Sequence, residues 1–126
     1  MIWAAGVGGM AGAMLRYALG KIITRKAAAA GSSFPWGTWL INISGSLLLG
    51  ILYVLTVEGI LPSLGWAVLG IGFCGAYTTF STFGYETMQL IRADKSIQAA
   101  LYVMSSVIVG IAAAFAGMWL TSFIVN

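Results

Sequence analysis

Hydroxyl side chains and glycines gather in one apolar part of the chain, the segment Gly72–Gly84. Its sequence, GFCGAYTTFSTFG, carries five hydroxyl side chains and three glycines. Hydrocarbon offers no partner to a backbone or hydroxyl group, so a membrane tolerates such a segment only where protein or a water-filled cavity surrounds it. We therefore predict a helix that is broken near this point and lines a site.

Two other segments carry polar side chains at helical spacing. Thr38, Asn42 and Ser46 recur every four residues, as do Tyr102 and Ser106. Residues four apart share a helix face, so each set forms a polar stripe. An interhelical hydrogen bond would account for a single asparagine, but a stripe of three polar residues favours a polar path.

Aromatic rings and charges flank these hydroxyl groups. Phe80 and Phe83 are three residues apart and can share a face, and their ring edges carry positive partial charge that attracts a small anion. Arg16 lies deep in an apolar segment, where a fixed positive charge also attracts anions. Glu86 follows Phe83 by one turn, and a carboxylate inside a membrane segment is a candidate functional group.

The predicted polar interior consists almost entirely of neutral hydrogen-bond donors. Its members are Thr38, Asn42, Ser46, Thr79, Ser81, Thr82, Tyr102 and Ser106, with Arg16 and Glu86 at a vestibule. An anion that leaves water needs donors to replace its hydration, just as a cation needs carbonyl oxygens. Small, strongly hydrated fluoride fits a narrow donor-lined path, whereas a large organic substrate requires a wider apolar pocket.

Composition places the chain in a membrane and argues against an enzyme. Of 126 residues, 60% are hydrophobic and only 7% are charged, and mean hydropathy is +0.98. Soluble domains carry about 25% charged residues. The chain has no histidine and a single cysteine, Cys74. It therefore lacks the commonest general base and the usual ligands of transition metals.

Four apolar segments predict an all-α integral membrane protein with one domain, a four-helix transmembrane channel domain spanning residues 1–126. The segments run from about Ile2 to Leu19, Trp36 to Val57, Gly65 to Ile91 and Ser96 to Ile124. Each is long enough to cross a hydrocarbon core of ~30 Å at ~1.5 Å per residue. The first is interpreted as a spanning helix rather than a cleaved signal, because no basic stretch precedes it.

The chain resembles the Fluc (CrcB) family of fluoride channels over nearly its whole length. The motifs that carry the resemblance are GGMAGAMLRY at Gly8–Tyr17, GTWLINISGSLLLG at Gly37–Gly50 and GFCGAYTTFSTF at Gly72–Phe83. The resemblance implies a passive fluoride exporter of the bacterial inner membrane. It also implies a homodimer of two subunits in opposite orientations, the two-chain equivalent of an inverted repeat.

The resemblance also implies roles for single residues. Phe80 and Phe83 match the pore phenylalanines, and Asn42 matches the pore amide. Tyr102 and Ser106 match the start of a hydroxyl track whose third position is Gly110 in this chain. Ser81, Thr82 and Thr38 complete the expected fluoride pore.

A structural sodium ion is a further implication of the resemblance. Gly75 and Thr78 match the break whose backbone carbonyls hold Na⁺ at the centre of the dimer, and such oxygen ligands suit a hard cation.

The basic residues depart from the balance expected of a chain inserted in both orientations. Lys21, Arg25, Lys26, Arg92 and Lys95 all fall on the side opposite the termini, which favours a single orientation.

Two other functions compete with a fluoride channel. A small proton-coupled exporter needs a titrating carboxylate in mid-membrane, and Glu86 is the only acidic residue within a predicted span. An anchor or assembly subunit that transports nothing is the second alternative, but it gives no reason for donor stripes on three segments.

Overall fold

The computed structural model describes residues 2–126, and Met1, which the predicted domain includes, lies outside them. The described residues form helices joined by turns, with no strand among them. The helices in chain order are α1 (Ile2–Ala29), α2 (Trp36–Val57), α3 (Ser63–Gly65), η1 (Trp66–Cys74), α4 (Gly75–Tyr77), α5 (Ser81–Arg92) and α6 (Ser96–Val125).

The third apolar segment is broken close to its middle, as the sequence predicts. The first part runs without interruption from α3 through η1, which has π-helical turns, to the end of α4. Thr78 then adopts an extended conformation, with φ −77° and ψ 154°. A helix cannot continue through such angles. It resumes at Ser81, so the break consists of residues 78–80.

A threonine side chain within the break caps the second part of the helix. The hydroxyl group of Thr79 accepts a hydrogen bond from the backbone N–H of Thr82 at 3.3 Å. The first N–H groups of a helix have no partner within the helix, and a threonine hydroxyl just before them supplies one. A side chain of the break itself, that of Thr79, therefore stabilises the start of α5.

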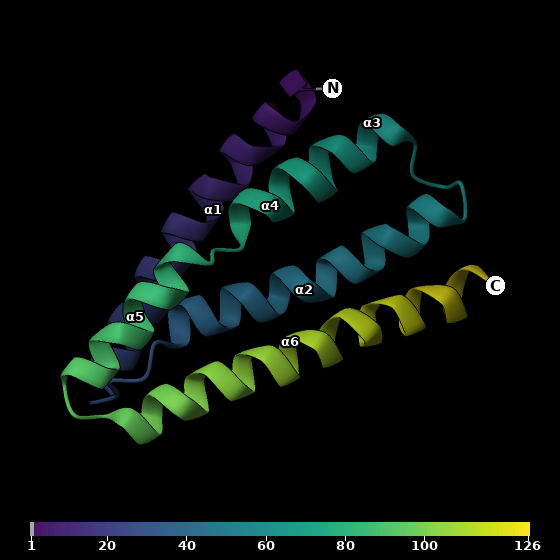
Figure 1. Cartoon of the computed structure of the whole chain (residues 1–126). Helices are drawn as coiled ribbons and strands as arrows, with labels where there is room; N and C mark the ends of the chain where they lie inside the picture. Colours follow the sequence, from purple (N-terminus) through teal and green to yellow (C-terminus); the bar gives the residue numbers. More distant parts are fainter. Residues whose placement is uncertain (1) are drawn as a thin grey trace.

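The helices pack so that the break lies between α1 and α2. Helix α2 runs along α6, and α1 packs against η1 and α4 (Figure 1). The two turns that follow α1 and α5 lie at one end of the molecule, and both termini lie toward the other end. The basic residues beside those two turns therefore share one end, as the sequence predicts.

Three segments within residues 2–126 are long and apolar enough to cross a membrane. They are Trp36–Val57, Ser63–Arg92 and Ser96–Val125. Helix α1 is not among them, and its second half carries the basic residues Arg16, Lys21, Arg25 and Lys26.

The first helix is longer than the sequence predicts. The apolar segment is expected to end near Leu19 and a connection to follow from Lys21 to Pro35, but α1 continues to Ala29. Lysine, arginine and alanine are all strong helix formers, so the basic, alanine-rich stretch extends the helix beyond its apolar part. Gly31, with φ +82°, then allows the chain to turn.

Glycines bring α1 into direct backbone contact with the first part of the broken helix. A Cβ atom added to Gly12 would overlap the carbonyl oxygen of Phe73, and one added to Gly8 would overlap that of Val68. Small residues at a spacing of four allow such close approach in lipid. This contact holds the first part of the broken helix beside α1.

Replacing Gly12 with alanine should therefore destabilise the protein. The added methyl group forces the two backbones apart, and overpacking of this kind lowers the free energy of unfolding by ~1–3 kcal/mol. Thermal unfolding in detergent measures the effect. The matched control is Gly6→Ala in the same helix, where nothing lies within 4 Å of the added atom. Equal melting temperatures for the two variants would contradict this account of the α1 contact.

Candidate functional site

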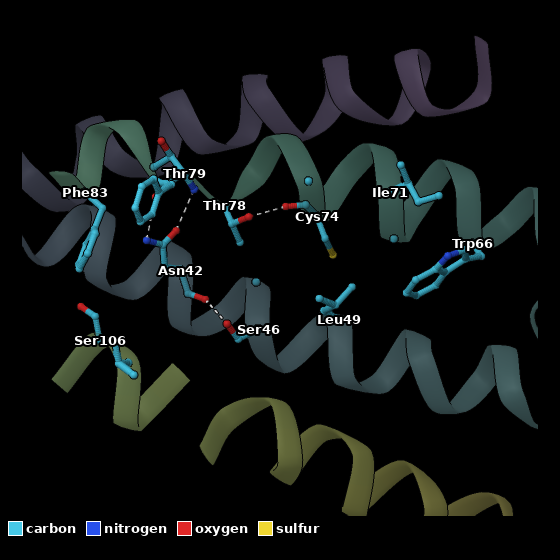
Figure 2. Close-up of a pocket in the computed structure, with 15 residues that line it drawn as sticks. Asn42, Ser46, Leu49, Trp66, Ile71, Cys74, Thr78, Thr79, Phe83 and Ser106 are labelled. Carbon is cyan, nitrogen blue, oxygen red and sulfur yellow. Dashed lines mark hydrogen bonds between the residues drawn. The ribbon is translucent and has the colours of Figure 1, made fainter. Parts of the chain in front are cut away.

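One cavity of about 570 Å³ collects polar groups from both sides of the break. Its lining residues come from α2, the broken third segment and α6 (Figure 2). Those that the sequence predicts for the polar interior, the pore or the break are Asn42, Ser46, Gly75, Thr78, Thr79, Phe80, Phe83 and Ser106. The structure thus brings together residues that lie far apart in the sequence.

Asn42 holds the backbone of the break with both ends of its amide group. Its Nδ2 donates to the carbonyl oxygen of Thr79 at 3.1 Å, and its Oδ1 accepts from the N–H of Thr79 at 3.0 Å. One side chain thereby satisfies both polar groups of a residue whose helical partners are lost at the break. An amide NH₂ has two hydrogens, so one donor of Asn42 remains for the cavity.

Ser106 presents a hydroxyl group that has no partner. Its Oγ is buried, and no hydrogen bond reaches it from the residues that the structure describes. Ser46 lines the same cavity, and its Oγ donates to the carbonyl oxygen of Asn42 at 2.8 Å (Figure 2). A buried hydroxyl group without a partner destabilises the fold, and a ligand that accepts a hydrogen bond from Ser106 would remove this penalty.

The two phenylalanines differ in their surroundings. Phe80 is 84% exposed in the isolated chain, whereas Phe83 is half-buried and packs on Tyr102 with ring centroids 4.9 Å apart. The ring centroids of Phe80 and Phe83 are 6.3 Å apart, and the rings are tilted by 35°. Both rings border the cavity that contains the donors of Asn42 and Ser106.

A second cavity, of about 360 Å³, lies on the α1 side of the break. Among its lining residues are Arg16, Lys21, Arg25, Thr38, Thr82 and Glu86. Its three basic side chains against one acidic side chain make it a positively charged cavity. Fixed charges of one sign in a cleft concentrate ions of the other sign.

Arg16 also has a structural partner at the break. Its Nε donates to the carbonyl oxygen of Ala76 at 3.0 Å, close to the end of α4. The last carbonyl groups of a helix lack intrahelical partners, and a basic side chain at that end satisfies them and complements the helix dipole. Arg16 therefore both charges the second cavity and caps the first part of the broken helix.

Tyr102 links the two cavities. It is completely buried, and its hydroxyl group donates to Glu86 Oε1 at 3.4 Å while its ring packs on Phe83. Glu86 borders the second cavity, and Phe83 borders the first. Tyr102 itself lines neither, so it lies behind the ring of Phe83 rather than in the open part of a hydroxyl track.

Ser81, like Tyr102, does not line the cavities of the predicted site. Ser81 is exposed and borders neither cavity, because it is the first residue of α5 and follows the break directly. Thr79 lines both cavities, in keeping with the polar interior that the sequence predicts, and Asn42 also holds its backbone. The run of hydroxyl residues around Thr79 is the only sequence signal for this contact.

Backbone oxygens at the break are the available ligands for a hard cation. Within residues 2–126 there is no group of three or more histidine, cysteine, aspartate or glutamate residues that could hold a metal ion. The same residues supply no hydrogen bond to the carbonyl oxygens of Gly75 and Thr78. Free carbonyl oxygens suit Na⁺ or Ca²⁺ better than transition metals.

Comparison with known protein families matches residues 3–118 to the family described as "CrcB-like protein, Camphor Resistance (CrcB)". The chain belongs to the CrcB-like family. The match includes the break, both cavities and every predicted site residue, so the geometry described above is that of a CrcB-like protein.

Several relatives match most of this CrcB-like chain. "Fluoride-specific ion channel FluC 2" of Clostridium acetobutylicum is 43% identical over 116 residues, which are 92% of this chain and 93% of that protein. "Fluoride-specific ion channel FluC 1" of Streptomyces avermitilis is 42% identical over 112 residues, 89% of this chain and 88% of that protein. With its apolar helices, the CrcB-like chain is a multi-pass membrane protein.

Removing the Arg16 side chain should destabilise this CrcB-like fold. Arg16→Ala leaves the Ala76 carbonyl without its donor, and an unsatisfied buried polar group costs ~1–3 kcal/mol. The melting temperature in detergent should fall, whereas Arg25→Ala, which removes an exposed cation from the same helix, should change it little. The same melting temperature for both variants would show that Arg16 acts through its charge alone.

Proposed function

We propose that this chain is a fluoride-selective channel, which lets F⁻ leave the bacterial cytoplasm passively across the inner membrane. Each subunit would cross the membrane four times, with α1 as the first span. The observation that carries the proposal is the unpartnered hydroxyl group of Ser106 in a cavity that also holds Asn42 and two phenylalanine rings. The printed names of the relatives support fluoride as the ion.

Neutral donors explain how a fluoride ion could enter and leave such a path. Loss of hydration is the main barrier for a small anion, and hydrogen bonds from Ser106 and the spare N–H of Asn42 would replace part of it. The positive edges of the Phe80 and Phe83 rings would add attraction. The described residues that line this cavity include no lysine or arginine, so the anion would not be trapped in it. Conduction of this kind needs no catalytic residue.

The charged cavity would serve as the vestibule. Arg16, Lys21 and Arg25 would raise the local concentration of anions there. Thr38 and Thr82 would supply hydroxyl groups between the vestibule and the break.

Glu86 would not act as the mid-membrane base of a proton-coupled exporter. Its carboxylate borders the vestibule, which Arg16 and Lys21 also line, and it accepts a hydrogen bond from Tyr102. No acidic residue is among the described residues that line the main cavity. A channel with neutral donors fits that cavity better than an exchanger that must carry a proton through it.

A second subunit in the opposite orientation would complete the pore. Phe80 is largely exposed and nothing lies within 4 Å of a Cβ atom added to Gly75, so the cavity is open on that side in one chain. A lipid tail offers no partner to the polar groups there, and a second protein surface does. The uneven distribution of lysine and arginine favours one orientation. Contacts at the break would therefore have to stabilise the subunit that is inserted the other way.

The break would also hold a structural Na⁺ ion. Gly75 and Thr78 would be its ligands through their free carbonyl oxygens, and the same two residues of the second subunit would complete the set. The ion would bind carbonyl oxygens of both subunits and so stabilise the contact between their two broken helices.

Efflux from liposomes that contain the purified chain tests this function. We expect fluoride to leave the vesicles while chloride is retained, as reported by ion-selective electrodes. Phe83→Ile, which keeps an apolar side chain but removes the ring, should slow fluoride efflux by about tenfold or more, the effect of ~1.4 kcal/mol on a barrier. Vesicles that hold fluoride, or that release chloride equally fast, would contradict the proposal.

A further inference from the structure

Ser46 lines the main cavity and belongs to the predicted polar interior, but it is not among the residues that match the pore of the Fluc family. It lies on α2 one helical turn after Asn42 and faces the cavity lined by Ser106 of α6 (Figure 2). Residues four apart share a helix face, so Asn42 and Ser46 lie on the same side of α2. The cavity therefore continues past the amide of Asn42 to a second hydroxyl group.

The hydrogen bond that Ser46 makes within its own helix is easily exchanged. Its Oγ donates to the carbonyl oxygen of Asn42, four positions earlier, at 2.8 Å. Such bonds from serine to the preceding turn add little stability, and a serine hydroxyl turns about one bond to reach another acceptor. The hydroxyl group is thus available to an anion without any change in the backbone.

The opposite helix leaves room for Ser46. Gly110 follows Ser106 by one turn of α6, and a Cβ atom added to it would lie 3.7 Å from Ser46 Oγ. That is an ordinary van der Waals distance, so the two positions face each other across the helix pair. Helix α6 contributes no side chain at this level, and the hydroxyl group there comes from α2.

We propose that Ser46 donates a hydrogen bond to the permeating anion and continues the donor series of Asn42 and Ser106 at the level of Gly110. This inference rests on the proposed channel function. At this level the donor comes from Ser46 of α2 and not from α6, because the α6 residue there, Gly110, has no side chain. The hydroxyl group leaves the Asn42 carbonyl when the anion arrives and returns to it when the anion moves on.

Moving the hydroxyl group from one helix to the other tests the proposal. Ser46→Ala should slow fluoride efflux from liposomes by about tenfold, equivalent to ~1.4 kcal/mol of barrier. Adding Gly110→Ser in the same chain should restore most of the rate, because the new hydroxyl group would stand next to the vacated place. Ser46→Ala with Gly110→Ala adds a side chain at the same position without the hydroxyl group and should stay slow.

Thr56→Ala is the matched control for loss of a hydroxyl group from α2. Thr56 donates to the Leu52 carbonyl oxygen at 2.8 Å, the same type of bond, but it lies outside the cavity. Its efflux rate should match that of the unaltered chain. Size-exclusion profiles and melting temperatures of all variants show whether they fold. Ser46→Cys, with a similar shape and a weaker donor, should give an intermediate rate and replaces Ser46→Ala if that variant unfolds.

The outcomes separate this inference from the proposed function. If the unaltered chain carries no fluoride, the channel function itself is wrong. If it conducts and Ser46→Ala conducts equally fast, Ser46 is no donor to the anion. The inference is also overturned if Gly110→Ser restores efflux no better than Gly110→Ala does.

Discussion

The bidentate pairing of the Asn42 amide with the Thr79 backbone is the interaction on which the rest of the site depends. A break in a membrane helix exposes peptide groups that hydrocarbon cannot satisfy. Asn42 satisfies both groups of Thr79 at once. Arg16 satisfies the Ala76 carbonyl at the end of the first part of the helix. These contacts stabilise the break, so that side chains on either side of it meet in one cavity.

The groups left without partners after this pairing are the ones with a proposed function. The hydroxyl group of Ser106 lies in the main cavity with the second N–H of Asn42, where an anion would need donors. The free carbonyl oxygens of Gly75 and Thr78 have the opposite preference and suit a cation. The acceptors are free because the helix bonds at the break are missing, whereas the donors are side-chain groups of α2 and α6 that border the same cavity.

The break could be predicted from the sequence, because hydroxyl residues and glycines in an unbroken apolar helix would leave polar groups facing lipid. Four-residue spacing also places Asn42 and Ser46 on one face of α2. The partners of Asn42 and Arg16 could not be predicted, since they are backbone atoms 37 and 60 positions away that carry no side-chain signal. Hydropathy underestimates the length of α1, because it marks the lipid boundary and not the end of a helix. Neighbouring residues suggest Ser81 as a pore residue, although its position at the start of α5 leaves it exposed.

Hydrogen exchange at the Thr79 amide tests the role of Asn42 most directly. In the unaltered protein the Thr79 N–H donates to Asn42 Oδ1 and should exchange slowly with deuterium. In Asn42→Ala it should exchange faster by about tenfold or more, as expected for loss of ~1.4 kcal/mol of protection, while an α6 amide such as that of Val109 keeps its rate. Equal Thr79 exchange in both proteins would show that another contact holds the break and would contradict the account.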